Sequence, residues 1–403
     1  MVLNVYSLKL LFMKIQILNN IDKAGLSVLE NGNFEFTSEL NEAAGIVLRS
    51  HNLQSMEVPE NLHAISRAGA GTNNINVELC SEKGVVVFNT PGANANAVKE
   101  IVLAGLLMSS RGIYAGASFV NEINGIDSKD LKAHIELGKK EFKGRELKGA
   151  TLGVVGMGAI GAQVAGMGVF LDMEVIGYDP AITVEAAWKL PNNVSRTDNL
   201  KTIFTNSDYV TLHVPAIEAT KNLIDHSVLS ECKADLKLIN FARDEIVDSG
   251  AIIKALESGQ LGSYVTDFAD LDLIKRAKEV GDVIILPHIG ASTRQAEENC
   301  SVMAADQLKD FLENGNIKNS VNFPELIEER QSDFRLTLSN RNVAGMIGQI
   351  TTILAENNIN IVELINKSRE EIAYNVIDLE TKPSDKVIED LEALENVINV
   401  RAI

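Results

Sequence analysis

The feature that most constrains the fold is the alternation of short β-branched runs with helix-length segments along most of the chain. Strand-like runs include KIQIL near residue 14, TLGVVGMG from Thr151 and DVIILPH from Asp282. Segments such as AVKEIVLAGLLMSSR, which are long enough for helices, lie between many of them. Strands that alternate with helices pair in parallel through right-handed crossovers, and the helices cover both faces of the sheet. We therefore expect an α/β protein with a doubly wound parallel sheet.

The pattern changes near the C-terminus. A polar segment, NIKNSVNFPELIEERQSD, contains Pro324 and a run of charges, which is typical of a linker. It is followed by FRLTLSN, an amphipathic helix over 346–357, INIVELINKS, IAYNVIDLE, a helix around 387–394, and INVRAI. This order of elements is βαββαβ, which predicts a ferredoxin-like domain over residues 331–403.

Composition excludes several classes of partner. The 403 residues carry a net charge of -18 and contain no basic block, which argues against nucleic acid or an anionic membrane as the main partner. No stretch has the eighteen or so uninterrupted apolar residues of a membrane helix. Cys80, Cys232 and Cys300 show neither disulfide nor metal spacing, so we expect a cytoplasmic protein without a metal site. Residues 1–12 lack a basic n-region and a cleavage site, and we expect them to be an extension.

The most informative motif is GMGAIG, which spans 156–161. It follows an apolar strand and opens a helix, and the next strand, MEVIGYD, ends at Asp179. In this context Gly156 permits a tight turn, Gly158 lets a pyrophosphate approach the backbone, and Gly161 lets the helix pack close to the strand. Asp179 would accept hydrogen bonds from the ribose hydroxyls and repel a 2′-phosphate, so NAD is favoured over NADP.

Other chemically active side chains follow later strands of the same sheet. Arg243 comes after LKLINFA, Asp267 lies within YVTDFADLD, and His288 follows DVIILP in the stretch LPHIGAST. The carboxyl ends of parallel strands meet at one edge, where ligands bind. A planar guanidinium can grip a carboxylate, and an imidazole can take a hydroxyl proton at neutral pH, so the set suits a hydroxy acid. His213, in TLHVP, also ends a strand and is expected to line the cofactor site.

The chain resembles the D-isomer-specific 2-hydroxy acid dehydrogenases from Met13 to Ile403. The resemblance is carried by RAGAGTNNIN, VFNTPGANANAVKE, GVVGMGAIG, NFARDEIVD, TDFAD, LPHIGAST and the final βαββαβ unit, which resembles an ACT regulatory domain. It implies a flavodoxin-like substrate domain split between residues 13–96 and 291–323, around a Rossmann-type NAD domain at 97–290. It also implies a homo-oligomer, a dimer or a tetramer, formed through the NAD domain.

The resemblance assigns roles to individual residues. The catalytic arginine and histidine fall on Arg243 and His288, and the acid that pairs with the histidine falls on Asp272, where relatives usually have glutamate, with Asp270 as a rival. The expected cofactor contacts are Gly156, Gly158, Ala159, Ile160, Gly161, Asp179, Val214, Pro215, Ala242, Asp267 and Gly290. The expected contacts to a substrate phosphate are Arg49, Ser50, Arg67 and Asn94.

The resemblance also implies an activity and its regulation. The expected reaction is NAD-dependent oxidation of 3-phospho-D-glycerate to 3-phosphohydroxypyruvate, the first step of L-serine biosynthesis. L-serine is the expected effector, held in the ACT domain by Asn340, Asn342 and Asn360, although Asn340 and Ala344 replace a histidine and a proline of serine-sensitive relatives. Two alternatives stay open: a hydroxypyruvate or glyoxylate reductase of the same family, and an NAD(H)-sensing regulator on the same fold.

Overall fold

The computed structural model describes residues 13–188 and 190–403, so the expected extension at residues 1–12 lies outside the described residues. The chain forms two compact units. One contains residues 13–94 together with Arg294–Ile403, and the other is Ala95–Thr293. The first unit is therefore built from two segments that are far apart in the sequence, and each unit is described by itself below.

The first unit contains a five-stranded parallel sheet in the order β2-β1-β3-β4-β5. Helix α12 follows the second unit in the sequence and packs against this sheet. The Ser66 hydroxyl of β4 donates to the carbonyl of Ala304 in α12 at 2.8 Å. The strand order reverses between β1 and β3, and ligands bind at such a reversal beyond the carboxyl ends of the strands. The elements are β1 (Met13–Leu18), α1 (Lys23–Glu30), β2 (Phe34–Thr37), β3 (Ala43–Leu48), β4 (Ala64–Arg67), α2 (Val77–Glu82), β5 (Val86–Phe88) and α12 (Arg294–Asn314).

The second unit contains a seven-stranded parallel sheet in the order β12-β11-β10-β9-β6-β7-β8. Its central strands are buried on both faces, which explains their continuous apolar sequences. The strands are β6 (Thr151–Val155), β7 (Glu174–Tyr178), β8 (Val194–Arg196), β9 (Tyr209–Leu212), β10 (Leu236–Asn240), β11 (Leu261–Thr266) and β12 (Val283–Ile285). The helices are α3 (Ala95–Ser110), α6 (Ala159–Phe170), α7 (Val184–Trp188), α8 (Leu200–Asn206), α9 (His226–Leu229), α10 (Ser249–Glu257) and α11 (Leu271–Glu279).

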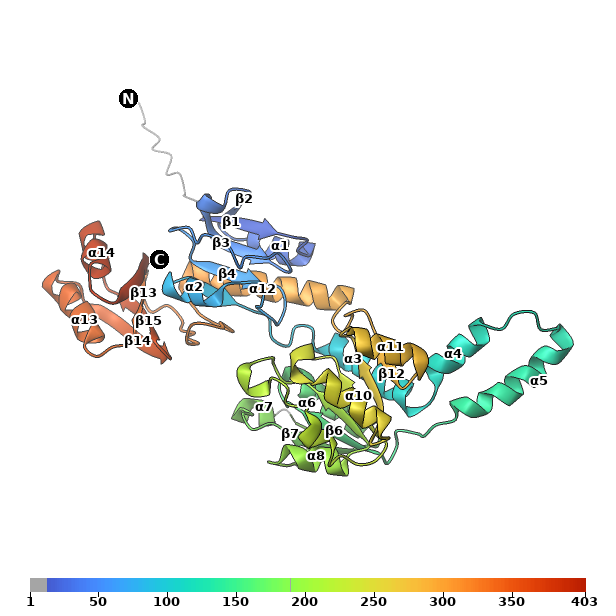
Figure 1. Ribbon diagram of the computed structural model, residues 1–403. Helices are drawn as coiled ribbons and strands as arrows, with labels where there is room; N and C mark the ends of the chain where they lie inside the picture. Colours follow the sequence, from blue (N-terminus) through green and yellow to red (C-terminus); the bar gives the residue numbers. More distant parts are fainter. Residues whose placement is uncertain (1–12, 189) are drawn as a thin grey trace. The chain divides into compact units, whose positions relative to one another are not determined.

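A helical arm extends from the second unit. It consists of α4 (Ile113–Asn121) and α5 (Ser128–Gly138), and neither helix has a buried residue. Figure 1 shows this arm reaching away from the sheet. No single helix among the described residues is long and apolar enough to cross a membrane; α3 and α4 reach that length and composition only together, across a 73° bend.

The C-terminal part of the first unit is a four-stranded antiparallel sheet in the order β14-β15-β13-β16, covered by two helices (Figure 1). Its core contains Leu336, Ile350, Ile377, Leu391 and Val400, which come from three strands and both helices. The order βαββαβ confirms the ferredoxin-like prediction. The elements are β13 (Phe334–Arg341), α13 (Met346–Glu356), β14 (Ile361–Arg369), β15 (Ile372–Leu379), α14 (Asp385–Glu392) and β16 (Val397–Ala402).

The segment between α12 and β13 is packed, which differs from the free linker suggested by its polarity. Ile317, Phe323 and Leu326 are buried, and Ile317 and Leu326 pair their backbones. The three apolar side chains belong to the same core cluster as Tyr374 of β15. The polar residues around them hid this contact, because their charges are carried on the exposed side of the segment.

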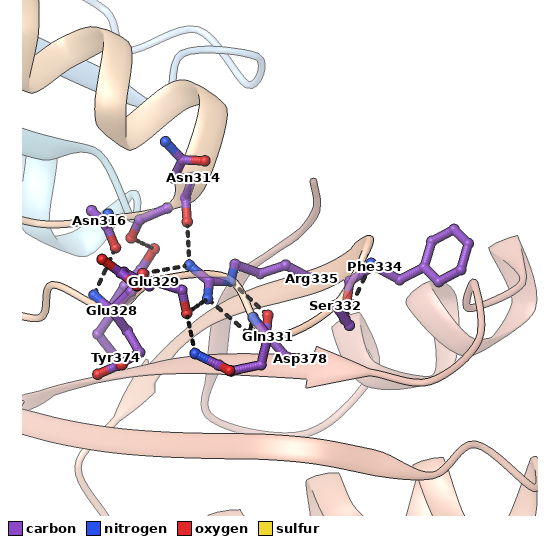
Figure 2. Close-up of polar contacts among 11 residues, drawn as sticks. Asn314, Asn316, Glu328, Glu329, Gln331, Ser332, Phe334, Arg335, Tyr374 and Asp378 are labelled. Carbon is purple, nitrogen blue, oxygen red and sulfur yellow. Dashed lines mark hydrogen bonds and ion pairs between the residues drawn. The ribbon is translucent and has the colours of Figure 1, made fainter.

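A buried guanidinium also joins the ferredoxin-like domain to this segment (Figure 2). Arg335, at the start of β13, donates to the backbone carbonyls of Asn314, Glu328 and Glu329 at 3.0 to 3.1 Å. Its remaining donors bind the carboxylate of Asp378 on β15. Each of these carbonyls lies outside the ferredoxin-like sheet, so one side chain connects the sheet to the end of α12 and to the segment that follows.

Candidate active site

The glycine turn between β6 and α6 has the shape that a dinucleotide phosphate requires. Gly156 has a φ of 91°, and a Cβ there would lie 2.7 Å from the carbonyl of His213. A Cβ at Gly161 would lie 1.8 Å from the carbonyl oxygen of Gly156, whereas nothing lies within 4 Å of one at Gly158. The backbone is therefore in close contact with the protein at Gly156 and Gly161, and it is accessible at Gly158, which is expected to face the pyrophosphate. Helix α6 begins at Ala159, so its free N–H groups lie next to Gly158.

Asp179 follows β7 beside this turn. Its Oδ2 accepts a hydrogen bond from the Met157 N–H at 2.8 Å, and its Oδ1 accepts one from the Ala181 N–H at 2.9 Å. A carboxylate has about four lone-pair positions, so two remain for ribose hydroxyls. The observed bonds fix the carboxylate next to the glycine turn, which fits an adenosine ribose of NAD.

Asp267 is the buried carboxylate of the strand-end cluster. It follows β11, is 2% exposed, and accepts the Gly290 N–H through Oδ2 at 2.8 Å. Its Oδ1 is shielded and has no hydrogen-bond partner among the described residues, which fits an amide donor from a ligand. Burial raises the pKa of Asp267, against the opposing effects of the Gly290 N–H and of the positive charges at His288 and Arg243. Asp267 thus lies within electrostatic range of both other predicted strand-end residues, His288 and Arg243.

The backbone sets the position of His288 after β12. Its φ is 50°, a left-handed conformation that costs on the order of 1 kcal/mol or more for a residue other than glycine. Its N–H donates to the carbonyls of Asp267 at 3.0 Å and Leu286 at 3.1 Å. The imidazole packs edge-on against Phe268, with ring centres 5.1 Å apart, and the residue is otherwise exposed in its unit. Strained backbone of this kind is common at functional sites.

Arg243 is held by a residue that sequence reasoning did not single out. Buried Asn240, the last residue of β10, donates from Nδ2 to the Arg243 carbonyl at 2.8 Å and accepts the Ala242 N–H through Oδ1 at 3.1 Å. Arg243 itself donates to the Ala242 carbonyl at 2.6 Å. The signal that could have identified Asn240 is a lone amide at the end of the apolar run LKLIN.

The two aspartates considered as partners of His288 have different surroundings. Asp270 caps α11, because its Oδ1 accepts the N–H groups of Asp272 and Leu273. Asp272 lies exposed in the first turn of that helix. Within residues 13–188 and 190–403, no hydrogen bond joins the imidazole of His288 to a carboxylate, so the pairing with Asp272 stays a prediction.

His213 is half-buried, and its imidazole is neutral near pH 7. Burial lowers the pKa of its imidazole to about 3, and its Nε2 lies 3.0 Å from the Thr211 hydroxyl. The residues that follow it, Val214 and Pro215, lie just beyond β9 at the same sheet edge, and Val214 packs against the core. Its place after β9 leaves the expectation that His213 lines the cofactor site as a prediction.

The expected phosphate contacts lie in the first unit, where Arg49 and Ser50 follow β3, Arg67 is the last residue of β4, and Asn94 comes after β5. Arg49 is one residue beyond β3, and its guanidinium lies 2.8 Å from the Glu297 carboxylate. The Ser50 N–H donates to Asn19 Oδ1 at 3.1 Å, and Arg67 Nε donates to Asn74 Oδ1 at 3.1 Å.

Two asparagines in these loops were not predicted. Asn19 has a φ of 69° and also accepts the His51 N–H, while Asn74 donates to the His51 carbonyl at 2.7 Å. Both asparagines hold the loop after β3 that carries Arg49, and Asn74 also accepts a hydrogen bond from Arg67. Asn94 lies at the boundary of the unit, and its Oδ1 is shielded without a hydrogen-bond partner among the described residues.

The three asparagines expected to bind an effector lie in different places. Asn340 is buried in β13, where its Oδ1 accepts from Asn375 and its Nδ2 donates to the Arg341 carbonyl, so its amide is used inside the sheet. Asn342 and Asn360 are exposed. Asn342 follows the end of β13 that pairs with Ile372, whereas Asn360 precedes the end of β14 that pairs with Leu379. Within one chain these two side chains therefore lie at opposite ends of the sheet, roughly 25 Å apart by strand rise.

Comparisons with known proteins identify the family and agree with the fold. Residues 106–290 match the model of the D-isomer specific 2-hydroxyacid dehydrogenase NAD binding domain, and residues 334–396 match the ACT domain. The solved structure of NAD+-bound 3-phosphoglycerate dehydrogenase from Entamoeba histolytica aligns with a TM-score of 0.61 and 27% identity, covering 78% of this chain and 99% of that one.

Two relatives named D-3-phosphoglycerate dehydrogenase show how far the likeness extends. The chain is 30% identical to the one from Haemophilus influenzae over 89% of this chain and 86% of the relative. It is 31% identical to the one from Methanocaldococcus jannaschii over 86% of this chain, but spans only 63% of that longer relative. The chain therefore belongs to the D-isomer-specific 2-hydroxyacid dehydrogenase family, with an NAD-binding domain and a C-terminal ACT domain.

Proposed function

We propose that the protein oxidises 3-phospho-D-glycerate to 3-phosphohydroxypyruvate with NAD, the first step of L-serine biosynthesis. The observation that carries this proposal is the gathering of Arg243, Asp267 and His288 at the strand ends of an NAD-binding sheet. The relatives named D-3-phosphoglycerate dehydrogenase support the choice of substrate within the family.

The residues divide the reaction between them. Bound NAD supplies the hydride acceptor. The Arg243 guanidinium grips the substrate carboxylate, which orients the carbon that carries the hydroxyl. The His288 imidazole takes the hydroxyl proton as the hydride leaves the same carbon, and returns it in the reverse direction. Asp267, fixed by the Gly290 N–H, offers its free Oδ1 to the nicotinamide carboxamide.

The phosphate is the part of the substrate that separates this activity from related ones. Arg49 supplies a guanidinium to it, with Ser50, Arg67 and Asn94 as further contacts. Asn19 and Asn74 hold the loop that carries Arg49 and Ser50, and Asn74 also accepts a hydrogen bond from Arg67. A hydroxypyruvate or glyoxylate reductase would use the same strand-end residues without needing a phosphate site.

The test is NADH-dependent turnover of 3-phosphohydroxypyruvate beside unphosphorylated hydroxypyruvate and glyoxylate. A strong preference for the phosphorylated substrate would support the proposal. Equal or reversed preference would leave the cofactor in place but move the function to a general 2-keto acid reductase, and absence of turnover with all three would favour an NAD(H)-sensing regulator.

We infer that the ACT domain binds an amino acid, with L-serine as the effector, where two copies of the chain meet. β14 is an edge strand with an exposed outer side, and antiparallel pairing of two such edges would place Asn342 of one copy beside Asn360 of the other. Their amides can hold a carboxylate and a hydroxyl. Serine that changes neither the rate nor the thermal stability would contradict this assignment.

A homo-oligomer, a dimer or a tetramer, is also proposed for the second unit. The arm formed by α4 and α5 exposes Tyr114, Val120 and Leu137, which are 61%, 50% and 68% exposed. Burial of these apolar side chains by a second copy of the chain would favour association of the two copies. Light scattering would measure the mass. The three buried, unpaired cysteines support a cytoplasmic location, which fractionation of cells would test.

A further inference from the structure

A cavity of about 590 Å³ opens in the first unit beyond the carboxyl ends of β1 and β3. This is where the strand order of the sheet reverses. The charged side chains that line the cavity are Asp22, Lys23, Arg49, Arg294, Glu297 and Glu298. Three of them are cations and three are anions, so the lining has no net charge, although it contains the arginine expected to meet a phosphate.

One anion in this lining is in direct contact with that arginine. Glu297 lies in the first turn of α12, and its Oε1 is 2.8 Å from Arg49 Nη1. The side chains are 46% and 38% exposed, so water and solutes reach both of them. An ion pair this exposed is weak, and a competing anion can replace it.

The electrostatic effect of Glu297 extends beyond this one bond. Burial raises the pKa of the Cys300 thiol, one turn along α12; the Thr90 hydroxyl and the positive charges of Arg49 and Arg67 oppose this shift, and the negative charge of Glu297 adds to it. The carboxylate therefore acts on the same small region as the two predicted phosphate contacts. A phosphate dianion in that region would meet repulsion from Glu297 in addition to attraction from the arginines.

We propose that Glu297 is a specificity-determining residue that competes with the substrate phosphate for Arg49. In the unbound protein it neutralises the arginine, and the phosphate must displace it. Glu297 therefore weakens phosphate binding and limits retention of small anions that lack the rest of the substrate. This inference rests on the proposed function, because it assigns Arg49 to the phosphate of a phosphorylated 2-hydroxy acid.

The test is Glu297→Gln, which keeps the size of the side chain and removes its charge. We expect the KM for 3-phosphohydroxypyruvate to fall about three- to tenfold while kcat changes less than about twofold, because one repulsive charge next to a dianion is removed. The KM for unphosphorylated hydroxypyruvate should change less. Glu297→Asp keeps the charge in the cavity and should leave the KM near that of the native protein.

A second measurement does not depend on turnover. The concentration of inorganic phosphate that gives half of its maximal thermal stabilisation should be several-fold lower for Glu297→Gln than for the native protein. Glu313→Gln makes the same change of charge at the far end of α12, outside the cavity, and should leave both measurements unchanged. Unfolding midpoints of the variants verify that each is folded.

The outcomes distinguish a failure of the proposed function from a failure of the role assigned to Glu297. A native protein that shows no preference for the phosphorylated substrate contradicts the proposed function. A native protein with that preference, together with a Glu297→Gln variant whose KM and phosphate affinity are unchanged or weaker, overturns the role of Glu297. A weaker affinity would mean that the carboxylate holds Arg49 in its binding position.

Discussion

Arg335 and Asp378 form a buried, two-point ion pair between neighbouring strands of the ACT domain. Arg335 Nε lies 2.7 Å from Asp378 Oδ1, and Nη2 lies 2.9 Å from Oδ2, with side chains that are 0% and 1% exposed. Because the same guanidinium also donates to three backbone carbonyls outside the sheet, the pair both satisfies a buried charge and attaches the ACT domain to the end of α12 (Figure 2).

Arg335→Met is expected to lower the free energy of unfolding by about 3–5 kcal/mol, because it leaves the Asp378 carboxylate and three carbonyls without their donor in a buried place. Urea unfolding measures this loss. Arg196→Met, which breaks an exposed ion pair with Asp198, is the matched control and should cost less than about 1 kcal/mol. Equal losses in the two variants would contradict the structural role of Arg335.

His288→Asn is expected to reduce kcat by about 10²–10⁴-fold, because the variant loses the proton acceptor. The dissociation constant of NADH should stay within about twofold, since the glycine turn and Asp179 remain in place. Turnover and NADH fluorescence titration provide the two readouts. Turnover that survives the substitution would remove His288 from the mechanism.

Asp179→Ser is expected to raise the KM for NADH by about tenfold or more, because the ribose hydroxyls lose a charged acceptor. The KM for NADPH should fall relative to that for NADH, since the repulsion of the 2′-phosphate disappears. The measurement is the ratio of kcat/KM for the two coenzymes. An unchanged ratio would show that Asp179 serves only the glycine turn.

Acid should destabilise the fold through His63. Burial, with a smaller effect of Arg401, lowers the pKa of this imidazole to about 4. Between the unfolded value of about 6.5 and this lower value, the unfolded chain binds a proton that the folded protein does not, so stability falls as the pH drops below about 6.5. At pH 5 the loss from this residue is on the order of 2 kcal/mol.

His63→Leu should therefore reduce the difference in unfolding free energy between pH 7 and pH 5 by about that amount. His226→Gln, a substitution at an exposed histidine, is the control and should leave the difference unchanged. A His63 variant with the native pH dependence would contradict the burial of a neutral imidazole at this position.

Much of the fold could be predicted from the sequence, because the spacing of apolar residues and the residues that favour turns are local features of the chain. Runs such as TLGVVGMG, YVTLHVP and DVIILPH coincide with β6, β9 and β12. The strands that the pattern missed are β2 and β8, which are four and three residues long and lie at sheet edges. Edge strands this short bury few side chains, so their sequences carry little periodic signal.

The placement of the candidate site residues was predictable where one strand end carries one charged side chain. Arg243, Asp267 and His288 follow successive strands in the sheet, and the parallel order alone brings them to the same edge. Asn19, Asn74 and Asn240 were missed because hydrogen bonds between loops depend on tertiary positions that periodicity does not encode. For the same reason the sequence did not reveal that the amide of Asn340, an expected effector contact, accepts a hydrogen bond from Asn375 across the sheet.

The measurement that tests the central claim most directly is the ratio of kcat/KM for 3-phosphohydroxypyruvate to that for hydroxypyruvate, in the native protein and in Arg49→Met. We predict a strong preference for the phosphorylated substrate in the native protein. In the variant the preference should fall by about tenfold or more, mainly through KM, because a charged hydrogen bond to the phosphate is lost. A native protein without the preference, or a variant that retains it in full, would contradict the claim that this family member acts on a phosphorylated 2-hydroxy acid through Arg49.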